Sequence, residues 1–244
     1  MRIGHASIDE RGKAKSGIAG DQTGKEVCIR NWYSKPWDYM LRCVDPNKAE
    51  LMAQACEAGC GNNHIGYDQN QRNSLRTQAK LCGMKLDRIM VDCETDCSAF
   101  MAVCAECAGI DIPYNAGNAP TTSSMKNAFM KTGWFKLFTE SKYTTSDKYL
   151  KRGDILVKSG SHTVMVLDNG TKGESRNLPV LKKGSKGEYV RNLQILLNEK
   201  IGCNLIVDGD FGTNTKNAVI SFQGLHGLDK DGIVGEKTWS KLIT

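Results

Sequence analysis

The order of hydrophobic and polar positions divides this chain into expected helices and strands. Helical patterns cover four stretches of its first part: residues 47–60, 69–82, 97–108 and 124–132. Shorter runs with strand composition lie at residues 2–9, 25–30, 154–158 and 162–167, the last two around a Ser-Gly-Ser turn. Helices grouped beside a small antiparallel sheet predict an α+β fold for this part.

Polar residues mark where two of these helices begin. Asp45 is followed by Pro46, so we expect Asp45 to cap the first helix and Pro46 to take its first position. Asp96 directly precedes Cys97 and is expected at the N-terminus of the helix over residues 97–108. Cys97 should therefore stand at the start of a helix.

The end of the chain contains an internal repeat. The pattern DGxxGxxT occurs at residues 208–215 and again at 231–238, each time supplying a glycine turn and a polar residue able to cap the next helix. A third helix precedes them, and all three are apolar on one face. The apolar positions are Tyr189, Val190, Leu193, Leu196 and Leu197, then Ala218, Val219 and Phe222, then Trp239 and Leu242. This pattern predicts a small three-helix unit.

A polar stretch separates the two parts. Residues 170–177 read Gly-Thr-Lys-Gly-Glu-Ser-Arg-Asn, which is aperiodic and typical of a linker. We therefore expect a first domain over residues 1–169, a linker over 170–177 and a second domain over 178–244.

Composition and charge narrow the classes of function. The formal net charge of the 244-residue chain is +6, and its basic residues are scattered rather than gathered in the stripe typical of nucleic-acid binding. We expect no nucleic-acid partner, whereas weak attraction to an anionic polymer such as a bacterial wall fits. No apolar run is long enough to predict membrane insertion, and no signal-peptide pattern is found at the start. Synthesis in the cytoplasm is expected, with any export by another route.

The ten cysteines are expected to be reduced thiols, because the chain is large and shows no signal peptide. Cys104 and Cys107 form one CxxC pair with no second pair at zinc-ribbon spacing, so no metal site is expected. The spacing of Cys56 and Cys60 puts both thiols on one helical face, where Cys behaves as a small buried hydrophobe.

Cys97 and His162 carry the candidate chemistry. A Cys at a helix N-terminus near a His is expected to have a lowered pKa, because unpaired backbone N–H groups and an imidazolium favour the thiolate. The same N–H groups can stabilise the oxyanion of a tetrahedral intermediate, and His162 can carry the proton to a leaving amine. The alternative is a buried structural Cys and an ordinary strand His.

Three strings around these residues, TDCSAF, GDILV and SHTVMVL, resemble the NlpC-type cysteine peptidase family. The resemblance implies a papain-like catalytic domain with Cys97 as nucleophile and His162 as base. It implies neither a metal nor an organic cofactor.

Residues 178–242 resemble the peptidoglycan-binding domain family found on wall hydrolases, through DGDFGTNTKNAVISFQ and DGIVGEKTW. The resemblance implies a groove that docks wall peptide or glycan. Each matching residue can also be explained as a turn or core residue, so no ligand contact is assigned.

A third residue should orient the imidazole, and none follows His162 at the place usual in the NlpC-type family. However, Ile3-Gly4-His5-Ala6-Ser7 and the aromatic stretch over residues 30–42 resemble that family's C-terminal pieces, in the right order. We therefore expect a circularly permuted domain in which the first strand pairs beside the His162 strand and His5 orients the imidazole. The rival is Asp168, which lies six residues along the same strand, about 20 Å away at ~3.3 Å per residue.

Two further residues are candidates for substrate binding. Tyr67 could line the cleft or assist the oxyanion, although a plain helix start capped by Asp68 is the preferred interpretation of its segment. Gln22 lies in a Gly-Asp-Gln-Thr-Gly turn that would border the site if His5 is catalytic, and a plain turn is the alternative.

Together these features predict an endolysin-like peptidoglycan hydrolase that cleaves an amide of the wall stem peptide after release to the cell wall. An amidase acting at the MurNAc–L-Ala bond with the same residues is one alternative. A wall-binding protein with a merely structural thiol is the other.

Overall fold

The structure of this chain is a computed structural model that describes residues 1–171 and 179–242. The chain divides into two compact units, Met1–Gly173 and Glu174–Thr244. Each has its own hydrophobic core. Residues 172–177 of the expected linker lie outside the described residues.

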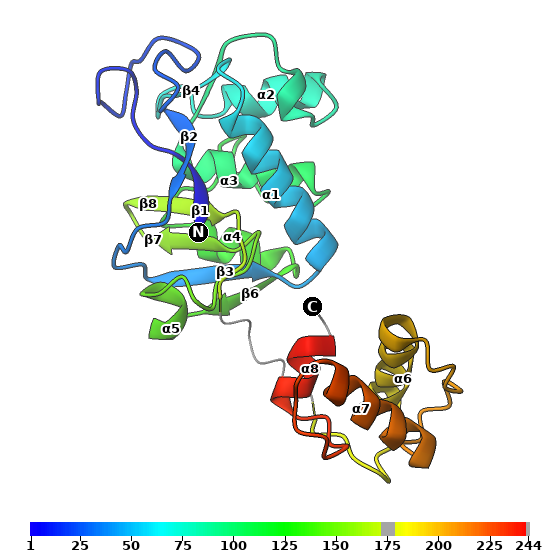
Figure 1. Cartoon of the computed structure of the whole chain (residues 1–244). Coiled ribbons are helices and arrows are strands. Elements are labelled where there is room, and N and C mark those ends of the chain that lie inside the picture. The colour runs from blue at the N-terminus through cyan, green and yellow to red at the C-terminus, as the bar shows by residue number, and fades with distance from the viewer. Residues whose placement is uncertain (172–178, 243–244) are drawn as a thin grey trace. The chain divides into compact units, whose positions relative to one another are not determined.

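The first unit is built on an antiparallel sheet of six strands in the order β2-β1-β8-β7-β3-β6 (Figure 1). The first strand, β1, lies inside the sheet: it pairs with β2 on one side and with β8 on the other, where Ile3 stands opposite Val166. The expected pairing of the N-terminal strand beside the His162 strand is therefore confirmed. The strands are β1 Arg2–Ala6, β2 Val27–Asn31, β3 Tyr39–Cys43, β6 Phe135–Phe138, β7 Ile155–Lys158 and β8 His162–Val166.

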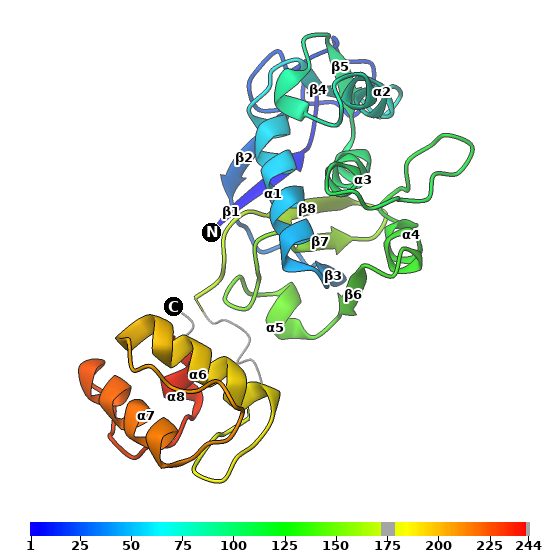
Figure 2. The same cartoon turned by 90° about the vertical axis from the view of Figure 1, so that its right-hand side faces the viewer.

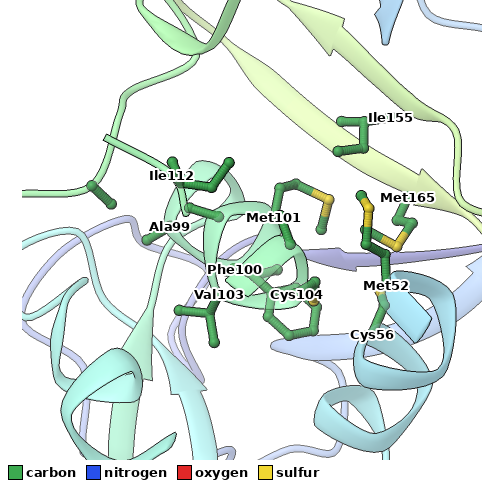
Figure 3. Close-up of a cluster of buried hydrophobic side chains, with 14 of the residues drawn as sticks. Met52, Cys56, Ala99, Phe100, Met101, Val103, Cys104, Ile112, Ile155 and Met165 are labelled. Carbon is green, nitrogen blue, oxygen red and sulfur yellow. The ribbon is translucent and has the colours of Figure 1, made fainter. Parts of the chain in front are cut away.

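Two helices cover one face of this sheet. In α1 (Pro46–Cys60), Asp45 accepts hydrogen bonds from the N–H groups of Asn47 and Lys48, as expected of its cap. The second, α3 (Cys97–Cys107), is buried along most of its length. Figure 3 shows the core between α1, α3 and the sheet, formed by Met52, Cys56, Phe100, Met101, Cys104, Ile155 and Met165.

Alternation along the strands gives the opposite face of the sheet a second, smaller core. Leu156 and Val164 project to this side, whereas their neighbours Ile155 and Met165 belong to the core under α1 and α3. Tyr143 from the short helix α5 (Ser141–Thr144) and Trp37 complete this second core. The remaining elements of the unit are β4 Ile65–Tyr67, α2 Ser74–Leu81, η1 Leu86–Arg88, β5 Cys93–Thr95 and α4 Met125–Lys131.

One expected helix is shorter than the pattern suggested. The helix expected over residues 69–82 begins only at Ser74, and Tyr67 belongs to β4, which pairs in parallel with β5. The expectation that Asp68 caps this helix is therefore wrong. Its carboxylate instead accepts hydrogen bonds from the backbone N–H groups of Ser16, in the loop between β1 and β2, and of Asn70.

The second unit contains the three expected helices, α6 Glu188–Ile201, α7 Thr213–Leu225 and α8 Glu236–Leu242 (Figure 2). The two DGxxGxxT repeats have matching hydrogen bonds. The Gln194 amide donates to Asp208 and Thr215 and accepts from the N–H of Gly209. The Gln223 amide does the same in the second repeat, with Asp231, Thr238 and Gly232.

All ten cysteines lie within the described residues and are free of disulfide bonds there. Within the described residues, no helix is long and apolar enough to cross a membrane.

Candidate active site

Cys97 is the first residue of α3, and its position is set by Asp96. The Asp96 carboxylate accepts hydrogen bonds from the backbone N–H groups of Ser98 at 3.0 Å and Ala99 at 2.7 Å, so the expected N-cap is confirmed. A bidentate ion pair with Arg72, at 2.6 and 3.0 Å, fixes the carboxylate in turn. Since both partners are largely buried, the pair holds the start of the helix in one place.

The first strand brings a second histidine to His162. The Nδ1 atom of His5 in β1 lies 3.3 Å from Nε2 of His162, the first residue of β8. The two rings meet edge to face, with their centroids 5.5 Å apart. Trp37 stacks on the His162 ring at a centroid distance of 6.4 Å. Both histidines are thus oriented by direct contacts.

Cys97 lies beside the backbone of β8. The N–H of Thr163, the residue after His162, lies near enough to the Cys97 thiol to act on its pKa. Among the hydrogen bonds of the described residues, none joins the thiol to either imidazole. The structure therefore joins the two histidines and sets the thiol beside the strand of His162.

The pKa of Cys97 differs from the expectation. Burial raises it to about 12, and the adjacent Asp96 carboxylate acts in the same direction. The N–H groups of Thr163 and Ser98 oppose this change but do not overcome it. The expected lowering by the helix N-terminus is wrong because the side chain is only 5% exposed, and desolvation penalises the thiolate more than the N–H groups stabilise it.

Burial also keeps both imidazoles neutral. It lowers the pKa of His162 to about 3, assisted by the charges of His5, Lys35 and Arg30. It lowers the pKa of His5 to about 4, with a smaller contribution from Arg30. At neutral pH the resting site therefore holds a neutral thiol and two neutral imidazoles, one of which can accept a proton.

The helix start offers fewer N–H groups than expected. Those of Ser98 and Ala99 are engaged by the Asp96 carboxylate. The N–H of Cys97 itself has no hydrogen-bond partner among the described residues and remains available to an oxyanion.

Tyr67 is buried on β4, and its hydroxyl accepts a hydrogen bond from Gln69 at 3.2 Å. Burial raises the pKa of the Tyr67 hydroxyl, and the charge of a Cys97 thiolate acts in the same direction. Tyr67 therefore lies in the neighbourhood of the thiol.

Gln22 lies in the loop between β1 and β2. Its side-chain amide donates to the carbonyl groups of Ala19 and Gly20 within the same loop, so the structure does not join it to Cys97 or His162. The loop is nevertheless tied to Tyr67 by the buried Glu26. One oxygen of this carboxylate accepts from the backbone of Gln22 at 3.0 Å and the other from that of Tyr67 at 3.1 Å.

Asp168, the rival third residue, is engaged elsewhere. Its carboxylate forms an ion pair with Arg2 at 2.7 Å and accepts a hydrogen bond from the Arg2 backbone at 2.6 Å. Of the two candidates, only His5 contacts His162.

Two residues of this site were not predicted from the sequence. Trp37 could have been found from the aromatic stretch that precedes β3. Cys28 stands opposite His5 in the β1–β2 pairing, with its Sγ 3.5 Å from Nε2 of His5. Its role depends on strand register, so no signal in the sequence pointed to it.

The family described as the endolysin-like domain matches residues 3–173. The chain belongs to the endolysin-like domain family. A peptidoglycan binding domain matches residues 186–242 of the same endolysin-like chain.

Individual relatives of this endolysin-like chain match it over stretches of different length. A zinc D-Ala-D-Ala carboxypeptidase of Streptomyces albus G is 47% identical over 64 residues, which cover 25% of this chain and 25% of that protein. The endolysin of Burkholderia phage AP3 is 44% identical, covers 26% of this chain and 24% of its own, and has a TM-score of 0.26. A peptidoglycan-binding protein of Clostridioides difficile, in complex with glutamine hydroxamate, is 25% identical, covers 70% of this chain and 87% of its own, and has a TM-score of 0.26.

The carboxypeptidase raises the question of a zinc site. Within residues 1–171 and 179–242, no three His, Cys, Asp or Glu side chains are grouped so that they could hold a metal ion. The donor set of a zinc centre, commonly three such ligands, is thus not found there. No step is assigned to a metal.

Proposed function

We propose that this chain is a peptidoglycan hydrolase that cleaves an amide bond of the wall stem peptide by a thiol mechanism. Cys97 is the nucleophile, His162 the base, and His5 the residue that orients His162. The contact between His5 and His162 is the observation that carries the proposal. It joins two histidines 157 residues apart, and one of them, His162, begins the strand that also borders the Cys97 thiol.

The domain architecture supports the choice of substrate. An endolysin-like domain and a peptidoglycan binding domain lie on one chain, so the second domain would hold the polymer that the first one cuts. The pairing of β1 with β8 fits a permuted NlpC-type, papain-like domain, in which the strand of the third catalytic residue comes first in the chain.

The first chemical step moves a proton from Cys97 to His162. As Sγ attacks the amide carbonyl carbon, His162 takes the thiol proton, because both groups are neutral at rest. The Cys97 N–H stabilises the oxyanion, with the Tyr67 hydroxyl as a second donor. His162 then protonates the leaving amine, and water hydrolyses the acyl-enzyme with His162 again as base.

Digestion of purified sacculi tests this function. The full chain should release muropeptides, and Cys97→Ala should abolish release while still sedimenting with sacculi. Cys82→Ala is the control for the loss of a thiol elsewhere in the first unit, since Cys82 is half-buried and donates its S–H to the carbonyl of Arg88 at 3.4 Å. Release that persists in Cys97→Ala, or that stops after treatment with EDTA, would refute the thiol mechanism.

Mass spectrometry of the products decides which bond is cut. New termini inside the stem peptide indicate the proposed endopeptidase. Separation of L-Ala from MurNAc indicates the amidase with the same residues. Binding without any new terminus indicates a wall-binding protein.

A further inference from the structure

Cys28 contacts His5 on the side opposite to His162. Its Sγ lies 3.5 Å from Nε2 of His5, and it donates its S–H to the carbonyl of Lys25 at 3.3 Å. With the contact of 3.3 Å between His5 and His162, four groups form a continuous hydrogen-bonded series. The series runs from the Lys25 carbonyl through the Cys28 thiol and the His5 imidazole to the His162 imidazole.

Two features of the fold hold the Cys28 thiol between His5 and the Lys25 carbonyl. His5 and Cys28 face each other in the register of β1 and β2. The turn before β2 is fixed by Asp21, whose carboxylate accepts backbone hydrogen bonds from five successive residues: Thr23, Gly24, Lys25, Glu26 and Val27. The Lys25 carbonyl is therefore presented to the thiol by a rigid turn.

The direction of these hydrogen bonds follows from the Lys25 carbonyl, which can only accept. When the Cys28 S–H is donated there, the sulfur is left as an acceptor for the Nε2–H of His5. The Nδ1 atom of His5 is then unprotonated and accepts from the Nε2–H of His162. The remaining nitrogen of His162, Nδ1, carries a free lone pair, as a general base requires.

Burial supports this assignment of protons. It raises the pKa of the Cys28 thiol, so the S–H is retained at neutral pH. Both imidazoles are neutral there, so each ring has one donor and one acceptor nitrogen.

We propose that Cys28 is a positioning residue that sets the tautomer of His5 and, through it, that of His162, so that Nδ1 of His162 is ready to accept a proton. This inference rests on the proposed function for its effect on turnover. The tautomer itself can be observed whether or not the protein cleaves the wall.

Two substitutions test the role in turnover. Cys28→Ser keeps a donor and an acceptor at this position, whereas Cys28→Ala removes both. His5 and Cys28 line a cavity of about 630 Å³, so the truncation enlarges an existing space rather than leaving a closed void. On a soluble stem-peptide substrate, kcat of Cys28→Ala should fall about threefold to tenfold, the range for one lost hydrogen bond, with KM unchanged. Cys28→Ser should retain more than half of the activity, and Cys82→Ala all of it.

Nitrogen NMR of full-length protein labelled at histidine tests the tautomer directly. His162→Gln identifies the signals of His162. In the wild type and in Cys28→Ser, Nδ1 of His162 should resonate as an unprotonated nitrogen. In Cys28→Ala it should move toward the protonated position as the two tautomers mix.

The outcomes separate the two proposals. A protonated Nδ1 in the wild type, identical spectra in all three proteins, or equal loss of turnover in Cys28→Ala and Cys28→Ser would overturn the role of Cys28. Nitrogen shifts that follow Cys28 in a protein without wall cleavage would support that role and refute the proposed function.

Discussion

Replacing His5 with Gln gives a direct measure of its burial beside His162. The folded protein holds the pKa of His5 at about 4, whereas an unfolded chain has a His pKa of about 6.5. Between these values the unfolded state binds a proton that the folded state does not. Stability is therefore complete above about pH 6.5 and falls as the pH is lowered towards 4. Gln has a similar size and does not titrate, so the His5→Gln variant does not lose this part of its stability at low pH.

The size of the effect follows from the two pKa values. At pH 5 nearly all unfolded chains, but few folded ones, are protonated at this position, which costs the wild type about 2 kcal/mol relative to pH 8. His5 also lowers the pKa of His162, so its removal relieves part of the same penalty there. Both contributions stabilise His5→Gln relative to the wild type as the pH falls.

Calorimetry of the first unit's transition at pH 8 and pH 5 measures this difference. A change of about 2 kcal/mol corresponds to a shift of roughly 4–8 °C in Tm for a domain of this size. The Tm of the variant minus that of the wild type should therefore rise by that amount on acidification. An offset that is the same at both pH values would mean that His5 titrates as an exposed residue, and would refute the buried contact with His162.

Three other substitutions test the framework of the protein. Arg72→Met should destabilise the first unit by about 3–5 kcal/mol in urea unfolding, because it leaves the Asp96 carboxylate buried without its partner; a loss below ~1 kcal/mol would contradict this role. Gln194→Ala and Gln223→Ala should each lower the stability of the second unit by about 1–3 kcal/mol, because each leaves a buried glycine N–H without an acceptor. An effect confined to one repeat would show that the matching hydrogen bonds are not energetically equivalent.

Local signals in the sequence predicted the start of α3 and the hairpin of β7 and β8. A cap such as Asp96 or a Ser-Gly-Ser turn acts on residues next to it, so both can be recognised without knowing the rest of the fold. The three-helix unit was predictable for the same reason, since each repeat carries its own turn.

The features that could not be predicted from the sequence depend on residues that are far apart in the chain. The loop before α2 continues to Asn73, and within it Arg72 reaches across to Asp96 and the carbonyl groups of Ala119 and Pro120. The pKa of Cys97 depends on how deeply the helix start is buried, and the contact of Cys28 with His5 depends on strand register. Tertiary packing determines each of these contacts and the pKa of Cys97, and no local sequence pattern predicts that packing.

The place of β1 between β2 and β8 has a consequence for when the candidate site can form. Within this unit, the strand that is made first pairs with one of the parts that are made last, since Ile3 stands opposite Val166. Contacts between such distant residues close late and slow folding. On a growing chain the Cys97 thiol therefore exists before its two histidines can meet. The order of synthesis delays assembly of the site until nearly the whole unit has been made.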